Sequence, residues 1–363
     1  MSVEFIGMIA TRKASEIHPA EGPVIDRDYI SRFAEAHEQA GFDRTLVAHH
    51  STGPDAFLVV SYAATVTDRL GFMLAHRPGF VEPTLAARKL ATLDQFTGGR
   101  LAVHIISGGD DAEQRRDGDF LGHDERYART DEYVDILRRI WTSDRQFDHN
   151  GAYYRFQGGF SEVKPVQRPH IPIYFGGASA PAIDVAGRHA DIYALWGETH
   201  EQVREQVARV RASAARHGRQ IRFSVSFRPI LADTEEAAWA RAADILERTR
   251  ALRAAQDAGP GDPKQSEGAR RLLAAAAQGE RVDKRLWTAI ARETGARSNS
   301  TALVGTPEQV ADALLDYWDL GVTTFLIRGF DPLEDAIDYG RALIPHTRAL
   351  VERRATQRPA KAG

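Results

Sequence analysis

The chain has 363 residues, of which 43% are hydrophobic, and this is enough for one large α/β barrel or for two ordinary domains. Its formal net charge of −3 is too close to neutral for a protein that coats nucleic acid. The chain has no cysteine, which excludes disulfides, thiolate nucleophiles and cysteine-ligated metals, so redox chemistry requires an organic cofactor or another metal.

Short apolar runs alternate with longer segments of helical period along the whole chain. The runs that we predict as strands are residues 4–9, 44–48, 70–75, 101–106, 171–175, 192–195, 222–230 and 323–327. The segments that we predict as helices are residues 29–40, 56–66, 84–96, 129–141, 181–189, 201–217, 235–257, 307–320 and 333–353. A strand followed by a helix, repeated in this way, favours an α/β fold that closes into a (β/α)8 TIM barrel, with an open doubly wound sheet as the alternative.

We expect residues 1–363 to form one such domain, with long insertions at the carboxyl ends of the strands. Residues 147–156 predict a small hairpin within one connection. The longest interruption, residues 258–300, predicts a mobile lid, although a tolerated surface excursion has the same pattern. Residues 355–363 predict a disordered tail.

The amino terminus and the hydropathy pattern bear on location. Residues 1–7 lack the basic and apolar regions of a secretion signal, and no apolar run approaches the length of a membrane span. We therefore expect a cytoplasmic protein with neither a membrane nor a nucleic-acid partner.

Residues 174–181, Tyr-Phe-Gly-Gly-Ala-Ser-Ala-Pro, place glycines where a strand ends and a serine where a helix begins. At Gly177, Ala178 and Ser179, backbone N–H groups, a hydroxyl and a helix dipole converge, and this arrangement predicts a phosphate site. The structural alternative is a glycine turn with a serine N-cap.

Arginine recurs where predicted strands end, at Arg77, Arg228 and Arg328. The carboxyl ends of barrel strands meet around one mouth, and guanidiniums gathered there require an anion to offset their mutual repulsion. We therefore expect an anionic ligand. For Arg328, an ion pair with Asp331 or Glu334 is the structural alternative.

Five histidines attract attention as possible metal ligands: His49, His50, His76, His104 and His123. Their spacing shows no dense pattern of histidine and carboxylate ligands, so we expect no catalytic metal.

Several segments, in family order, resemble the flavin-dependent bacterial-luciferase-like monooxygenases, and in particular the two-component alkanesulfonate monooxygenase branch. They include Leu-Ala-His-Arg-Pro-Gly (74–79), Ala-Thr-Leu-Asp-Gln-Phe-Thr-Gly-Gly-Arg (91–100), Val-His-Ile-Ile-Ser-Gly-Gly-Asp (103–110), Ile-Tyr-Phe-Gly-Gly-Ala-Ser (173–179) and Thr-Ala-Leu-Val-Gly (301–305). The resemblance implies a TIM barrel that uses FMN as FMNH2, supplied by a separate NAD(P)H-dependent flavin reductase. It also implies O2 as co-substrate and a homodimer or homotetramer.

The resemblance also assigns flavin-binding positions. Ala75 and His76 correspond to a bulged peptide, often cis in the family, that supports the flavin ring, and His104 takes the place of an Asn beside the flavin. Tyr127 corresponds to a tyrosine near the phosphate and ribityl chain. The cofactor-binding residues implied in this way are Ala75, His76, His104, Tyr127, Gly177, Ala178 and Ser179.

The substrate side departs from the family pattern. The family's Arg and His on the seventh strand are here Ser226 and Arg228, and its Tyr on the last-strand loop is Phe330. Arg297 resembles a lid arginine but is otherwise a solvated loop charge, and Trp196 either walls the pocket or only packs there. The implied substrate-binding residues are Arg12, His50, Trp196, Arg228, Arg297, Arg328 and Phe330, and the implied catalytic residues are Arg228, Arg297, Ser226 and His104.

The resemblance implies a monooxygenase that oxidises an organosulfonate or a related anionic organosulfur compound and releases sulfite and a carbonyl product. The departures leave three alternatives open. They are the same chemistry on a sulfone, an aminopolycarboxylate or a natural-product intermediate; hydride transfer, as in deazaflavin-dependent reductases; and flavin binding without turnover.

Overall fold

A closed barrel of eight strands, in the order β1-β14-β9-β8-β7-β4-β3-β2, organises the computed structural model, which describes residues 2–256, 266–296 and 300–357. The barrel strands are β1 (Glu4–Ile9), β2 (Arg44–Val47), β3 (Gly71–His76), β4 (Leu101–Ile105), β7 (Ile173–Gly176), β8 (Ile192–Trp196), β9 (Arg222–Phe227) and β14 (Val322–Ile327). The predicted TIM barrel is confirmed.

The largest difference from the predicted strand ends is at the seventh strand, which we expected to run to residue 230. It ends at Phe227, and Ile230–Leu231 form a separate short strand, β10, in another sheet. Pro229 lies between the two strands and has no N–H to donate to a ladder. Arg228 therefore lies directly after the end of β9.

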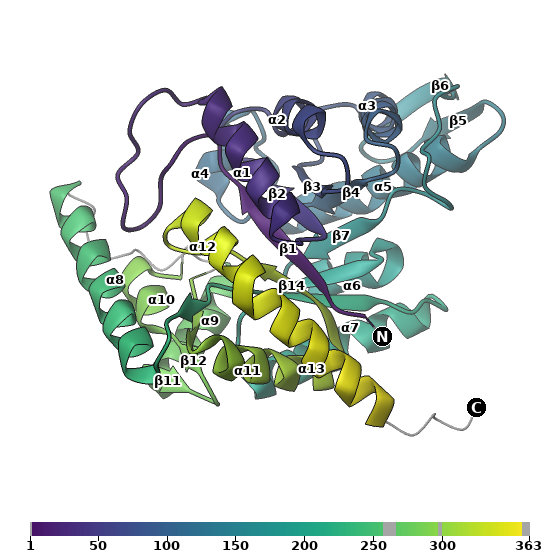
Figure 1. Ribbon diagram of the computed structural model, residues 1–363. Helices are drawn as coiled ribbons and strands as arrows, with labels where there is room; N and C mark the ends of the chain where they lie inside the picture. Colours follow the sequence, from purple (N-terminus) through teal and green to yellow (C-terminus); the bar gives the residue numbers. More distant parts are fainter. Residues whose placement is uncertain (1, 257–265, 297–299, 358–363) are drawn as a thin grey trace. The chain divides into compact units, whose positions relative to one another are not determined.

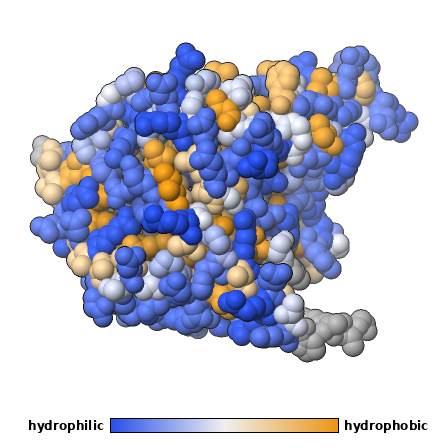
Figure 2. Space-filling model, viewed as in Figure 1, coloured by the Kyte–Doolittle hydropathy of each residue, from blue (hydrophilic) through white to orange (hydrophobic). Residues whose placement is uncertain are grey.

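Helices follow the strands in the predicted alternation (Figure 1). They are α1 (Arg27–Gln39), α2 (Ala56–Ala63), α3 (Pro83–Phe96), α4 (Asp111–Arg116), α5 (His123–Thr142), α6 (Ala180–His189), α7 (His200–Arg216), α8 (Glu235–Ala255), α9 (Glu267–Gln278), α10 (Ala289–Thr294), α11 (Pro307–Asp319), α12 (Pro332–Asp338) and α13 (Ile344–Gln357). Within the described residues, none of these helices combines the length and apolarity that a membrane crossing needs. The face seen in Figure 2 is mainly hydrophilic, with small hydrophobic patches.

The chain divides into two compact units, each of which is described by itself. The first comprises residues 1–45, 194–208 and 222–363, and the second comprises residues 46–193 and 209–221. In the second unit, the predicted hairpin is present as the antiparallel strands β5 (Phe147–Asn150) and β6 (Arg155–Gly159), at the upper right of Figure 1. Glu132 of α5 fixes this hairpin by accepting hydrogen bonds from the backbone N–H groups of Tyr153 and Tyr154.

In the first unit, the described part of the insertion 258–300 is regular structure rather than an open loop. It contains α9, α10, β11 (Arg281–Val282) and β12 (Leu286–Trp287), and β11 and β12 join a four-stranded sheet with β10 and β13 (Ala302–Gly305). Trp287 and Ile290 are buried in one core cluster with residues of α8. Figure 1 shows α10 beside α8. Strands of two residues carry too little periodicity to be predicted from sequence. Residues 257–265 and 297–299 lie outside the described part, and the lid stays a prediction.

The end of the chain is helical further than we expected. Residues 355–357, which we assigned to a disordered tail, belong to α13, while residues 358–363 lie outside the described part.

We predict that His37 makes the fold sensitive to acid. The residue is 2% exposed, its Nδ1 donates to the Phe33 carbonyl at 2.7 Å, and a Cβ at Gly7 would lie 2.1 Å from its Cδ2. Burial lowers the pKa of His37 to about 4, against the opposing effect of the Phe33 hydrogen bond. Below pH 6.5 the imidazole of the unfolded chain binds a proton, whereas the buried imidazole of the folded chain stays neutral down to about pH 4. Protonation therefore favours the unfolded chain, so the free energy of unfolding is unaffected by His37 above pH 6.5 and decreases as the pH falls from 6.5 toward 4. Replacing His37→Gln should reduce the stability lost between pH 7 and pH 5 by about 2 kcal/mol, as measured by urea unfolding. An unchanged loss would contradict the assignment.

We also predict that a buried ion pair fastens α9 to the segment after β8. Arg271 Nε lies 2.9 Å from Glu198 Oε2 and its Nη1 lies 3.0 Å from Glu205, while the Glu198 side chain is only 4% exposed. Because loss of one partner strands a buried charge, Arg271→Met should lower the free energy of unfolding by about 3 kcal/mol and speed amide exchange in α9. The neighbouring Arg270, 68% exposed, is the matched control, and Arg270→Met should change stability by less than about 0.5 kcal/mol. Equal losses of stability in the two variants would show that the Arg271–Glu198 ion pair does not hold α9 in place.

Candidate active site

In the second unit, the turn between β7 and α6 leaves room for a close approach to the backbone. Gly177 has φ +130°, and a Cβ there would lie 2.8 Å from both Ala182 Cβ and Tyr127 Oη. Ser179 caps α6, with its Oγ accepting from the Ala182 N–H at 3.4 Å. The serine cap that we gave as the structural alternative is therefore present. Gly177, Ala178 and Ser179 nevertheless remain partly exposed at the positive end of the α6 dipole.

Two tyrosines surround this turn. Tyr193 donates a hydrogen bond to the Gly177 carbonyl, which fixes the direction of that peptide. Tyr127, at the start of α5, is 8% exposed, and the Ser179 side chain acts on its phenol. Burial raises the pKa of Tyr127, against the effect of Ser179, so the residue is a neutral phenol that can donate to an anion. Tyr127 and the turn, singled out separately in the sequence, thus lie together.

His104 lies on β4 between Ala75 of β3 and Tyr174 of β7, which are its register partners. Its Nδ1 is buried and finds no hydrogen-bond partner among the described residues. Burial lowers the pKa of His104 to about 4, so the imidazole is neutral at physiological pH. A neutral ring with an unsatisfied nitrogen is suited to hydrogen-bond a ligand.

His76 lies on the opposite face of the sheet from Ala75 and His104, because side chains alternate along a strand. Its Nε2 is 2.7 Å from Tyr133 Oη of α5, and its ring meets the edge of Phe57 of α2. His76 is 4% exposed, and burial lowers its pKa to about 3. These contacts are with the covering helices, which favours a structural role over the expected place in a flavin pocket.

The backbone at Ala75 and His76 also differs from the family expectation. β3 pairs regularly with β4 through both residues, without a bulge. The cis peptide bond in the described part of the chain is Arg168–Pro169, so the Ala75–His76 bond is trans.

The arginine after β3 has internal partners. Arg77 is 4% exposed, and its Nη2 lies 3.0 Å from Glu113 Oε1, with Asp117 at 3.9 Å from Nη1. Glu113 also accepts from the Ser51 N–H at 3.1 Å and lies 3.6 Å from Nε2 of the exposed His50. Burial acts to raise the pKa of Glu113, but Arg77 outweighs it and the pKa is lowered. Arg77 therefore needs no ligand to offset its charge.

In the first unit, the arginines after β9 and β14 share one carboxylate. Glu16, in the connection between β1 and α1, lies 2.5 Å from Arg228 Nη1 and 3.5 Å from Arg328 Nη2 through the same oxygen, Oε1. Arg228 also donates to the Gly329 carbonyl at 2.9 Å, and its guanidinium lies 3.6 Å from the centre of the Phe330 ring. We call Glu16, Arg228 and Arg328 the charge triad.

Charges within the triad shift the pKa values of Glu16 and Arg328. Burial acts to raise the pKa of Glu16, but Arg228 and Arg328 together lower it to about 2. Burial and then the neighbouring Arg228 lower the pKa of Arg328 to about 10, which leaves it charged at physiological pH. The triad therefore carries a net charge of +1, from two guanidiniums and one carboxylate. Arg228 is 1% exposed, whereas the side chain of Arg328 is 24% exposed.

The structural alternative for Arg328 involved other acids, which pair elsewhere. Asp331 lies 2.5 Å from His18 and 3.3 Å from Arg241, and Glu334 lies 3.8 Å from Lys13. The carboxylate that Arg328 meets is instead Glu16.

The remaining predicted site residues have internal contacts of their own. Arg12 donates to the Gly22 carbonyl of its own loop at 3.4 Å, and the Ser226 hydroxyl donates to the Leu195 carbonyl at 3.4 Å. Trp196 packs against α9, where a Cβ on Gly268 would lie 2.9 Å from its ring, and this favours the packing alternative. Phe330 is fully buried in the core cluster beneath Arg228. Arg297 lies outside the described residues.

Sequence reasoning found the arginines but missed Glu16 and Glu113. A signal was available, because each carboxylate follows a barrel strand that neighbours the strand bearing its arginine. Glu16 follows β1, next to β14 in the barrel, and Glu113 follows β4, next to β3. Strand order had to be known before those loops were seen as neighbours. Within the described residues, no group of three or more metal-ligating side chains gathers.

The sequence matches the family model for luciferase-like monooxygenases over residues 3–324. Among solved structures, a riboflavin lyase with modified FMN and riboflavin has a TM-score of 0.79 at 20% identity, over 100% of this chain and 94% of that chain. EDTA monooxygenase from Chelativorans sp. BNC1 has a TM-score of 0.76 at 18% identity, over 97% of this chain and 95% of that chain. DmoA from Hyphomicrobium sulfonivorans has a TM-score of 0.73 at 22% identity, over 100% of this chain and 90% of that chain. These likenesses show a shared fold, and because the family model spans most of the sequence, the chain belongs to the luciferase-like monooxygenase family.

Proposed function

We propose that the protein is a monooxygenase that uses FMNH2 and O2 to oxidise an organic acid, with organosulfonates as the leading substrate class. The observation that carries the proposal is the turn of Gly177, Ala178 and Ser179 at the start of α6, with Tyr127 beside it. A helix N-terminus with partly exposed residues, a hydroxyl and a neutral phenol suits the phosphate of FMN.

The chain's own residues divide the work in this proposal. In the second unit, the Gly177–Ser179 turn and Tyr127 hold the cofactor phosphate, while the neutral His104 offers its unsatisfied Nδ1 to the flavin. The charge triad orients the acidic end of the substrate through the more exposed Arg328. Ser226 and Arg228 act as supporting residues, since the first hydrogen-bonds to the backbone and the second is almost completely buried.

When bound, reduced FMN supplies two electrons to O2, so that one oxygen atom enters the substrate and the other leaves as water. With an organosulfonate, oxygen is added at the carbon that bears sulfur, the C–S bond breaks, sulfite leaves, and a carbonyl product remains. A separate NAD(P)H-dependent flavin reductase regenerates FMNH2.

Related folds supply the competing substrates for a test. The similar structures include an EDTA monooxygenase and a riboflavin lyase, and another is an F420-dependent secondary alcohol dehydrogenase. The purified protein should be supplied with NADH, a generic flavin reductase, FMN and air, together with a panel of alkyl and aryl sulfonates, an aminopolycarboxylate, a sulfone and riboflavin.

The expected result is oxygen uptake that depends on both FMN and a sulfonate, with one sulfite and one carbonyl formed per turnover. Turnover of another panel member without sulfite would keep the flavin chemistry and reject the sulfonate. Activity with reduced F420 and no oxygen uptake would reject the monooxygenase, and flavin binding without any turnover would leave a binding protein.

We further predict that Gly177→Ala weakens the binding of FMNH2 by at least about tenfold, because the new methyl group would meet Tyr127 Oη and Ala182 Cβ at 2.8 Å in a backbone conformation that favours glycine. Anaerobic titration with reduced FMN measures the change. The control is Gly218→Ala, at a position that also has a positive φ, of +63°, but open space around it. Affinity should be unchanged in the control, and equal losses in both variants would point to general backbone strain instead.

A further inference from the structure

The connection between β1 and α1 holds Glu16 in a fixed place although it contains no helix or strand. Ile17, the next residue, is 5% exposed and belongs to a core cluster with α8 and Phe330. The Ile17 carbonyl accepts from Arg248 at 3.3 Å, and His18 lies 2.5 Å from Asp331. The loop is therefore anchored directly after Glu16.

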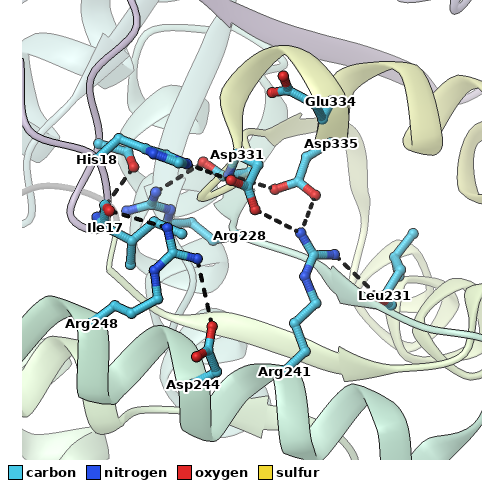
Figure 3. Close-up of polar contacts among 12 residues, drawn as sticks. Ile17, His18, Arg228, Leu231, Arg241, Asp244, Arg248, Asp331, Glu334 and Asp335 are labelled. Atoms are coloured by element: carbon cyan, nitrogen blue, oxygen red, sulfur yellow. Dashed lines mark hydrogen bonds and ion pairs between the residues drawn. The ribbon is translucent and has the colours of Figure 1, made fainter. Parts of the chain in front are cut away.

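The anchor is itself braced by two helices. Arg241 of α8 reaches Asp331 at 3.3 Å and Asp335 of α12 at 2.6 Å, and it donates to the Leu231 carbonyl at 3.2 Å. Figure 3 shows this arrangement, with His18 and Arg241 meeting Asp331 from the loop and from α8, and with Arg228 nearby. A loop fastened to both α8 and α12 does not swing away easily when a ligand arrives.

The fixed Glu16 carboxylate lowers the positive charge that the two arginines present to a ligand. Two guanidiniums alone would favour a doubly charged acid, but Glu16 already offsets one of them at 2.5 Å. Arg228 is held by Glu16, by the Gly329 carbonyl and by the Phe330 ring, and is 1% exposed. Arg328, whose side chain is 24% exposed, is therefore the guanidinium of the charge triad that a ligand can approach more easily.

We propose that Glu16 is a specificity-determining residue that restricts the site to acids carrying a single negative charge and rejects diacids. The triad's net charge of +1 balances one anionic group, while a second anionic group would meet the Glu16 carboxylate without a partner. Calling this ligand the substrate rests on the proposed function, but the preference for monoanions does not.

The test needs neither flavin nor oxygen, so its failure is separate from failure of the proposed monooxygenase. Three probes of matched chemistry are titrated at constant ionic strength by calorimetry. They are methanesulfonate with one charge, methanedisulfonate with two, and the uncharged dimethyl sulfone. The proteins are the wild type, Glu16→Gln, and the control Glu334→Gln, which removes the same charge from an exposed residue paired with Lys13.

In the wild type and in Glu334→Gln, methanesulfonate should bind more tightly than methanedisulfonate. In Glu16→Gln, methanesulfonate should bind about tenfold more tightly than in the wild type, because a neighbouring negative charge has been removed. Methanedisulfonate carries two charges, so its affinity should rise about a hundredfold over the wild type. Dimethyl sulfone should be unaffected. Equal gains for both anions, a gain in Glu334→Gln as well, or no anion binding in any of the proteins would overturn the proposal.

Glu16→Gln leaves the buried Arg228 without its carboxylate and can therefore lose stability. If it does not fold alone, methanesulfonate and methanedisulfonate should restore its folding, with the dianion effective at the lower concentration, and dimethyl sulfone should not. Glu16→Asp keeps the charge and should retain the wild-type preference for the monoanion. Failure of the anions to restore folding, or a preference for the dianion in Glu16→Asp, would refute the role of the charge.

Discussion

The pairing of one carboxylate with two strand-end arginines is the interaction on which the proposed substrate site of this protein depends. β9, β14 and β1 are consecutive in the barrel, so the segments that follow them bring Arg228, Arg328 and Glu16 together. Two guanidiniums this close would repel each other strongly in a partly buried place. Glu16 relieves that repulsion within the chain, because one of its oxygens lies near both guanidiniums.

The same principle recurs in the second unit with the opposite outcome. Arg77 meets Glu113 and lies near Asp117, so its charge is more than offset and the cluster does not call for an anion. The place that we propose for an anion in this unit is instead the turn at Gly177 and Ser179, which lies at the N-terminus of α6. Each unit thus offers one place suited to a negatively charged group, made by different means.

Much of the architecture could be predicted from the sequence because it depends on local pattern. The alternation of apolar runs with helical segments gave the barrel, and the glycines and serine at residues 176–179 marked the turn before α6. Arginines at strand ends were visible for the same reason. What could not be predicted depends on which loops become neighbours. Glu16 and Glu113 lie outside regular strands of the barrel, and no period connects either of them to its arginine.

The sequence also could not decide on which face of a strand a side chain lies. His76 and His104 both lie in strands that were predicted nearly correctly, yet only His104 shares the face of Ala75, while His76 turns to Tyr133 and Phe57. A shift of one residue in register exchanges the two faces of a strand, so a sequence that is apolar on both sides cannot decide between them. The short strands of the insertion were missed because two residues show no alternation.

The most direct measurement of the account is a crystal structure of the protein soaked with methanesulfonate, with the sulfur located by its anomalous scattering. The account predicts the sulfonate beside Arg328, with Glu16 still bridging Arg228 and Arg328. A sulfonate bound to Arg228 in the place of a displaced Glu16, or one found away from the charge triad, would contradict it.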